Sequence, residues 1–153
     1  MTDRISAERR SRNMAAIHGR NTKPEQYLRH ELFIRGFRYR NNVSYICGHP
    51  DIYLAKYNIA IFVNGCFWHR HKGCKDAAVP KSHAEFWNEK FRKNVLRDRK
   101  VRKEILKNGI RYCVVSECTI RKMAADPSYN RQIMNRINRL IRHPNDRPQS
   151  IEF

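Results

Sequence analysis

The sequence predicts a single α/β domain, residues 1–153, in which helices flank a mixed central sheet. First, 153 residues suffice for one domain with a sizeable hydrophobic core. Second, short apolar segments of strand character cluster at residues 37–63, after two helical patterns. Third, a long helical pattern separates them from a nearly all-apolar segment at residues 110–115. A strand, a crossover helix and a strand in this order should form a parallel pair with a right-handed connection.

Two helices are predicted before the first strand. Residues 7–17 form a short, Arg-rich helix with Met14 and Ile17 on one face. The second helix begins near Thr22, because the sequence from Thr22 to Glu25 matches a capping box and its proline suits a first helical turn. Gly36 ends this helix.

The strands follow at once. Phe37 and Tyr39 alternate with arginines, which is the pattern of a strand, and residues 52–54 and 59–63 form two more. A tight connection at residues 56–58 joins the last two strands. Neighbouring segments of the chain therefore build the first half of the sheet.

A long basic helix at residues 83–108 opens the second half. Between residues 90 and 107 it carries nine basic residues against two acidic ones, so it can face a polyanion. Residues 110–115 then form a strand buried on both faces. A last helix runs from Asp126 to about residue 141, and the polar tail 143–153 is expected to be loose.

The charge of the chain points to nucleic acid. Lys and Arg number 32 against 14 Asp and Glu, a formal net charge of +18, and a field of this sign attracts polyanions. The alternative is a basic surface that only maintains solubility. No apolar run could span a membrane, and the first residues lack the apolar centre of a signal peptide. We therefore expect a cytoplasmic, nucleoid-associated protein without a membrane partner.

The segment 66–74 contains four potential metal ligands and two large aromatic side chains. Five cysteines, an odd number, favour metal binding over a disulfide framework in a reducing compartment. Two cysteines and one histidine of this segment, together with Cys118 after the next strand, can complete a tetrahedral zinc site. Either His69 or His71 could be the histidine ligand. The alternative is a set of free thiols beside a solvated histidine.

Asp51 stands after Pro50, at the start of the predicted strand 52–54. A carboxylate there, beside a neighbouring strand that offers a second oxygen, can bind Mg²⁺, which takes hard oxygen ligands. An ordinary turn also explains a Pro-Asp pair. Nucleases with such a pair usually carry Glu-x-Lys or Asp-x-Lys on the next strand, but this chain reads Phe62-Val63-Asn64 there. The lysine is missing.

Several separated motifs between residues 11 and 121 occur in one characteristic order. They are Arg12-Asn13-Met14, Asn21-Thr22-Lys23-Pro24-Glu25, Gly48-His49-Pro50-Asp51, Gly65-Cys66-Phe67-Trp68-His69, Phe86-Trp87, Lys93-Asn94 with Arg97-Asp98, and Glu117-Cys118. In this order the chain closely resembles the very short patch repair endonucleases. The resemblance implies a fold related to type II restriction enzymes of the PD-(D/E)xK kind, a structural zinc ion, and Mg²⁺-dependent cleavage of one DNA strand 5′ to the thymine of a T:G mismatch.

The resemblance also implies the roles of the candidate catalytic residues. Asp51 and the backbone carbonyl of Val63 resemble the Mg²⁺ ligands. His69 resembles the general base, which replaces the missing lysine, and Asp98 resembles the acid that orients its ring. Glu25 resembles a residue that holds metal-bound water, although the capping box explains Glu25 from local physics alone.

Four residues resemble the ligands of the structural zinc ion: Cys66, His71, Cys74 and Cys118. Three aromatic residues resemble a wedge inserted beside the mismatch: Phe67, Trp68 and Trp87. A mismatched step is easier to unstack, and each aromatic–base stack returns about 1–3 kcal/mol. Core packing is the alternative for Trp87. The N-terminal helix within residues 1–20, with Met14, resembles an arm that reaches the DNA from the opposite groove.

The chain departs from the family pattern at His49, where many members carry Arg, and at Asn64, which is often a histidine. Both positions bear on catalytic efficiency and base preference. We expect a monomer that acts on double-stranded DNA with a T:G mismatch, functionally linked to a cytosine-5 methyltransferase and to mismatch-repair proteins. Three other functions are alternatives to a mismatch endonuclease. They are a non-catalytic zinc DNA-binding module, a restriction-type nuclease that cuts perfectly paired DNA, and a nuclease whose catalytic metal is bound by His69 and His71.

Overall fold

The structure, a computed structural model, describes residues 6–16, 19–143, 145 and 150–153. Its centre is a five-stranded sheet with the order β1-β2-β3-β4-β5. The strands are β1 (Arg40–Asn41), β2 (Ile52–Leu54), β3 (Ile59–Asn64), β4 (Arg111–Ser116) and β5 (Ser150–Glu152). β2 pairs antiparallel with β1 and β3, whereas β4 pairs parallel with β3 and β5. The predicted mixed sheet, with β3 and β4 parallel, is confirmed.

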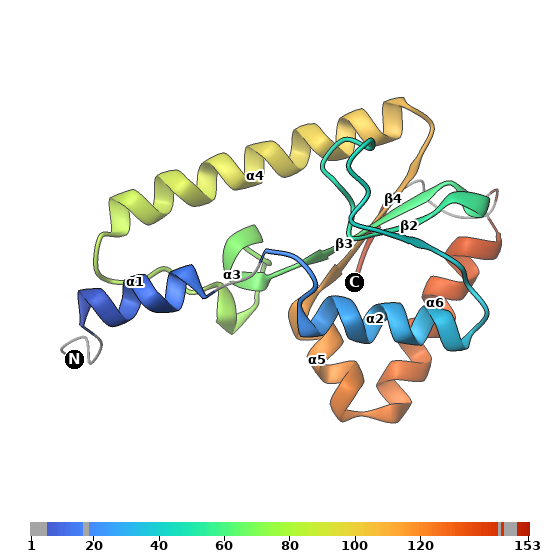
Figure 1. The fold of residues 1–153 in the computed structure, drawn as a ribbon, viewed down its shortest axis with the longest axis horizontal. Helices are drawn as coiled ribbons and strands as arrows, with labels where there is room; N and C mark the ends of the chain where they lie inside the picture. The colour runs from blue at the N-terminus through green and yellow to red at the C-terminus, as the bar shows by residue number, and fades with distance from the viewer. Residues whose placement is uncertain (1–5, 17–18, 144, 146–149) are drawn as a thin grey trace.

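Helices cover both faces of the sheet (Figure 1). α2, α5 and α6 pack against one face, and α4 crosses the other. The bounds are α1 (Ala7–Ala15), α2 (Lys23–Ile34), α3 (Cys66–His69), α4 (Ala84–Lys107), α5 (Glu117–Ala125) and α6 (Pro127–Arg142), with short 3₁₀ helices at Ala55–Tyr57 and Lys75–Ala77. The capping-box helix, the long basic helix and the last helix therefore lie where the sequence predicts them.

The central strands β3 and β4 are buried on both faces. Ile61 and Val115 belong to the core cluster under α2, α5 and α6, whereas their neighbours Ala60 and Val114 belong to the cluster under α4. Successive side chains of a strand point to opposite faces, so an apolar residue is needed at every position. The nearly continuous apolar sequence of both strands follows from this burial.

α4 packs on the sheet only through its C-terminal part. Ile105 is fully buried there, whereas Phe86 near the N-terminal end is 61% exposed. A helix of 24 residues is about 36 Å long, so its first half extends beyond the sheet (Figure 1). This projecting half forms one wall of the cleft described below.

The strand around Phe37 and the segment after β4 both differ from the elements that the sequence predicts. The strand expected around Phe37 and Tyr39 shortens to β1, because Phe37 turns into the core and packs edge-to-face on Tyr57. α5 has no counterpart among the predicted elements, since only Ile120 and Met123 mark its buried face within a short sequence. It follows β4 directly and begins beside the Cys/His segment.

The expectation of a loose C-terminal tail is wrong for the last residues of the chain. Ser150–Glu152 form β5 at the edge of the sheet. The Phe153 amide donates to the Val114 carbonyl at 2.9 Å, and the Phe153 carbonyl accepts from the Ser116 amide at 2.9 Å. Ile151 and Phe153 also pack against the core. Backbone pairing with an existing strand requires little apolar patterning, so the polar composition of the tail concealed this strand.

Within the described part of the chain, no helix combines the length and the apolar character that crossing a bilayer requires.

The loop between β1 and β2 is held against α4 at Gly48. Val43 and Ile46 anchor this loop in the cluster under α4. Gly48 has φ +77°, and a methyl group placed on it would overlap the Val101 side chain and lie 3.3 Å from the Phe62 ring. Glycine is therefore required both for its backbone conformation and for this close approach. The contact fixes the loop just before Asp51.

Gly48→Ala should destabilise the fold by about 2–4 kcal/mol, because it adds overpacking to the cost of a left-handed backbone. Gly36→Ala is the matched control, since Gly36 has φ +86° with open space around it and should lose only about 1–2 kcal/mol. Urea unfolding measures both variants. Equal losses would contradict a close approach at Gly48.

Candidate active site

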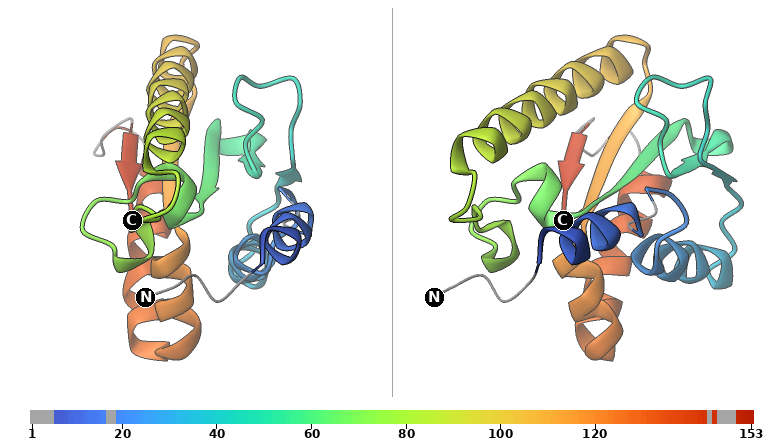
Figure 2. Two further views of the ribbon diagram at one scale, coloured as in Figure 1. Left: turned by 90° about the vertical axis from the view of Figure 1, so that its left-hand side faces the viewer. Right: turned by 60° about the vertical axis from the view of Figure 1, so that its left-hand side comes forward.

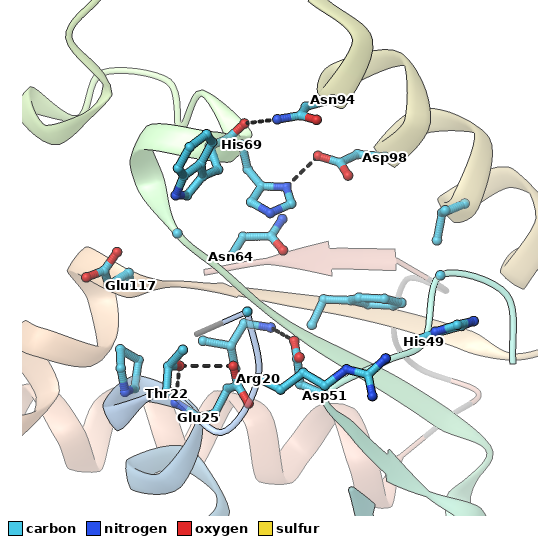
Figure 3. Close-up of a pocket in the computed structure, with 18 of the residues that line it drawn as sticks. Arg20, Thr22, Glu25, His49, Asp51, Asn64, His69, Asn94, Asp98 and Glu117 are labelled. Carbon is cyan, nitrogen blue, oxygen red and sulfur yellow. Dashed lines mark hydrogen bonds and ion pairs between the residues drawn. The ribbon is translucent and has the colours of Figure 1, made fainter. Parts of the chain in front are cut away.

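A cleft of about 1060 Å³ lies between the α1–α2 connection and α4, with the ends of β2 and β3 at its floor. Figure 3 shows His69 and Asp98 on one wall, and Glu25 and Asp51 on the other. All four residues predicted to be catalytic line this cleft. They come from α2, from the start of β2, from α3 and from α4. The structure therefore gathers distant segments in one place.

Asp51 precedes β2 and turns its carboxylate toward β3. Its Oδ2 accepts a hydrogen bond from the Val63 amide at 2.7 Å. The N–H and C=O of one residue leave a strand on the same side, so the Val63 carbonyl also faces Asp51. Burial raises the pKa of Asp51 to about 6, against the lowering effect of the Val63 amide, and the nearby Glu25 carboxylate raises it further. A cation beside Asp51 would relieve this unfavourable charge.

His69 and Asp98 form a close pair across the cleft wall. His69 Nδ1 lies 2.6 Å from Asp98 Oδ2, and the two side chains are 23% and 26% exposed. The carboxylate fixes the ring orientation and leaves Nε2 to face the cleft, toward Asn64 (Figure 3). Asp98 is also 3.7 Å from the Arg97 guanidinium. The pair has the geometry of a general base with an orienting acid.

Glu25 closes the N-terminal end of α2, as the capping box predicts. The Thr22 hydroxyl donates to Glu25 Oε1 at 3.0 Å and accepts from the Glu25 amide at 3.5 Å. Glu25 Oε2 accepts from the Asn21 amide at 2.8 Å. The carboxylate also lines the cleft. The two expectations for Glu25 are thus compatible, and the structure supports the capping one directly.

Arg29 lies behind this wall, outside the lining of the cleft. It is 6% exposed, and its Nη2 donates to Glu25 Oε2 at 3.2 Å and to the Asp51 carbonyl at 3.1 Å. Its Nη1 donates to Asn21 Oδ1 at 3.0 Å. Arg29 therefore ties the cap of α2 to the backbone of Asp51. The spacing of four residues from Glu25 on a helix was the sequence signal for this pair.

The Cys/His cluster lies beside the cleft. The donor atoms of Cys66, His71, Cys74 and Cys118 all lie within 4.8 Å of one another. Zn–S bonds of about 2.3 Å in a tetrahedron would separate the donors by about 3.5–3.8 Å, and His71 Nδ1 is already 3.2 Å from Cys118 Sγ and 3.7 Å from Cys66 Sγ. These four residues could hold a tetrahedral metal ion. His69 is not among them, because its ring pairs with Asp98.

The three predicted wedge residues form an aromatic cluster at the junction of α3 and α4. The Phe67 ring centroid is 5.1 Å from that of Trp68 and 5.4 Å from that of Trp87. Phe91, one turn after Trp87, completes the cluster and is the buried member. The Lys90 ammonium lies 5.1 Å from the Trp68 ring centroid. The other three rings remain only partly buried, so they are accessible beside the cleft.

A basic α/β domain with a carboxylate, a histidine–aspartate pair and accessible aromatic rings in one cleft has the groups of an enzyme that cleaves DNA. Residues 2–76 match the family model of the DNA mismatch endonuclease Vsr. The chain is 42% identical, over 95% of its length and 99% of the relative, to the type II nicking enzyme V.NmeAIP of Neisseria meningitidis serogroup A. It is 39% identical, over 79% of its length and 77% of the relative, to the DNA mismatch endonuclease Vsr of Escherichia coli. The chain belongs to the Vsr family of DNA endonucleases.

Asp51→Asn should stabilise the metal-free protein at pH 8 by about 2–3 kcal/mol, since it removes a buried charge. The pKa of Asp51 rises from 3.8 to about 6 on folding, so the penalty is absent below pH 3.8 and complete above about pH 6. The stabilisation should therefore vanish near pH 4. Urea unfolding in buffer without Mg²⁺ and without chelator, at the two pH values, measures it.

Asp76→Asn is the control for this prediction, because Asp76 forms only a surface ion pair with Arg121. Its removal should change stability by less than about 1 kcal/mol and in the destabilising direction. A destabilised Asp51→Asn protein at pH 8 would contradict the burial argument.

Proposed function

We propose that this protein nicks one DNA strand 5′ to the thymine of a T:G mismatch in a Mg²⁺-dependent reaction, and so begins the very short patch repair of deaminated 5-methylcytosine. The observation that carries the proposal is the cleft, which holds Asp51 and the His69–Asp98 pair beside the partly exposed rings of α3 and α4. The names of the relatives support both the mismatched substrate and the nicking reaction, since one relative is a mismatch endonuclease and another a nicking enzyme.

The donors on the Asp51 wall fit Mg²⁺. A carboxylate, a backbone carbonyl directed to the same side and the neighbouring Glu25 carboxylate are hard oxygen groups, and Mg²⁺ keeps several waters beside such donors. We assign Asp51 and the Val63 carbonyl as its protein ligands, with Glu25 holding a bound water. When bound, Mg²⁺ would stabilise charge on the phosphoryl and leaving oxygens. This arrangement also supports a core related to the PD-(D/E)xK nucleases.

His69 is the proposed general base. Its Nε2 accepts a proton from the attacking water, and Asp98 at Nδ1 stabilises the imidazolium that results. The ring therefore performs the role for which the related nucleases use a lysine. Asn94 supports this geometry, because its Nδ2 donates to the Trp68 carbonyl at 3.2 Å and so connects α3 with α4.

The aromatic cluster is the proposed wedge. Phe67, Trp68 and Trp87 would enter the DNA stack at the mismatch, where unstacking is easiest. α1 and α4 lie apart from one another in both views of Figure 2, which suits a duplex held between the N-terminal segment 1–20 and the basic helix. The predicted contact by Met14 belongs to this arm, although its side chain lies outside the described part of the structure.

The Cys/His cluster is proposed to bind a structural Zn²⁺, because three thiols and an imidazole form a closed tetrahedral donor set. The substrate arises where cytosine is methylated. We therefore also propose a monomer that acts at the nucleoid, functionally linked to a cytosine-5 methyltransferase and to mismatch-repair proteins.

The wild-type protein should nick a labelled T:G duplex with Mg²⁺ and leave the matched T:A duplex and the EDTA control intact. His69→Ala should lower the nicking rate by about 10²–10⁴-fold while binding of the duplex changes little. His30→Ala, an exposed histidine outside the cleft, should leave both unchanged. Equal cutting of matched DNA would contradict mismatch specificity, and strong nicking by His69→Ala would contradict its role as base.

Purified protein should contain one zinc ion per chain by elemental analysis. Cys74→Ser should lower zinc occupancy and the melting temperature together, because metal binding contributes directly to folding. Cys47→Ser is the control, since Cys47 is exposed and outside the cluster. A chelated protein that keeps its melting temperature would argue against a structural metal.

A further inference from the structure

We infer that Arg20 is a further catalytic residue, whose guanidinium binds the phosphate that is cut. The inference rests on the proposed nicking reaction and assigns a group that recognises the transferred phosphoryl. Arg20 lines the cleft at the connection between α1 and α2. Its side chain is exposed and, in Figure 3, reaches along the Asp51 wall toward His49.

The negative charge of the cleft requires a positive side chain that can bind the phosphate. Four acidic residues line it: Glu25, Asp51, Asp98 and Glu117. A DNA phosphate is itself an anion, and it must approach these carboxylates closely if Asp51 and His69 are to act on it. One divalent cation compensates only part of this charge. A fixed positive side chain at the same wall would supply more.

The other cations of the cleft are placed elsewhere. Lys90 and Arg97 both belong to α4, on the opposite wall, where Lys90 lies over the Trp68 ring and Arg97 lies 3.7 Å from Asp98. Arg29 does not line the cleft, because it is buried behind the wall and bonded to Glu25 and to the Asp51 carbonyl. For Arg20, no acidic side chain among the described residues lies within ion-pair distance. Within the described part of the chain, no carboxylate therefore competes with a phosphate for its donors.

The backbone next to Arg20 is fixed. Asn21 has φ +58°, and three of its groups are bonded: its amide to Glu25, its carbonyl to Gln26 and its Oδ1 to Arg29. The network that caps α2 therefore also determines where Arg20 leaves the chain. A preorganised position of this kind is what electrostatic stabilisation of a transition state requires.

Arginine suits the task because its planar fork can donate two hydrogen bonds to the non-bridging oxygens of one phosphate. In the reaction, the water oxygen bonds to phosphorus and the bond from phosphorus to the leaving sugar oxygen breaks. The water proton passes to His69 Nε2, and the leaving oxygen takes a proton from solvent. Arg20 keeps its protons throughout and stabilises the charge that grows on the non-bridging oxygens.

Arg20→Ala should lower the single-turnover nicking rate at saturating protein by about 100-fold or more, with less than a tenfold loss in affinity for the T:G duplex. Arg20→Lys should be intermediate, because it keeps the charge without the fork. Lys23→Ala is the matched control, since Lys23 is exposed, close in sequence and outside the cleft. It loses the same charge and should nick at the wild-type rate.

Guanidinium chloride, below denaturing concentrations and matched in ionic strength with NaCl, should partly restore nicking by Arg20→Ala and not by His69→Ala. Nicking by Arg20→Ala within threefold of wild type, or a loss confined to affinity, would overturn the inference while wild-type nicking of T:G DNA leaves the proposed function intact. A wild-type protein that does not nick T:G DNA would overturn both. Melting curves of all variants exclude unfolding, which an exposed side chain should not cause.

Discussion

The site depends on the burial of β3 on both faces. Because Ile61 and Ala60 pack into opposite core clusters, the strand cannot shift without exposing apolar surface, and its C-terminal end has a fixed position. Val63, the last but one residue of this strand, holds the Asp51 carboxylate through its amide. α3 begins two residues after the strand ends and carries Cys66 and His69. The core of the sheet thus determines where the chemistry takes place.

Parallel pairing of β3 with β4 extends this order to the Cys/His cluster. The last pair in register joins Asn64 with Ser116. Cys66 therefore follows β3, and Cys118 follows β4, each two residues after this pair. Both leave the sheet at the same end, because the strands run in the same direction. The Cys118 amide lies 3.4 Å from Cys66 Sγ. Two cysteines 52 positions apart are therefore brought together by strand register.

Much of this architecture could be predicted from the sequence, because local signals were strong. The capping box marked α2, the apolar runs marked β3 and β4, and Asp126 marked the start of α6. Position in the sheet revealed Asp51, and the spacing of the cysteines revealed the Cys/His cluster, while the roles of His69 and Asp98 and the choice of His71 came from family resemblance. Contacts between distant segments carried no local signal. Arg29 donates to the Asp51 carbonyl, and β5 pairs with β4. Both contacts join segments that are far apart in the sequence, so local sequence patterns could not predict them.

α4 has one further mechanical consequence. Its C-terminal part is anchored on the sheet near Ile105. Asp98 lies about two turns before this anchor, and Trp87 lies much farther away, in the projecting half. At 1.5 Å per residue, Trp87 is about 27 Å and Asp98 about 10 Å from this anchor. A tilt of the helix about the anchor moves Trp87 about two and a half times as far as Asp98. The helix is thus a lever: a tilt that displaces the Trp87 ring by a given distance displaces the Asp98 carboxylate, and with it the His69 ring that it holds, by much less.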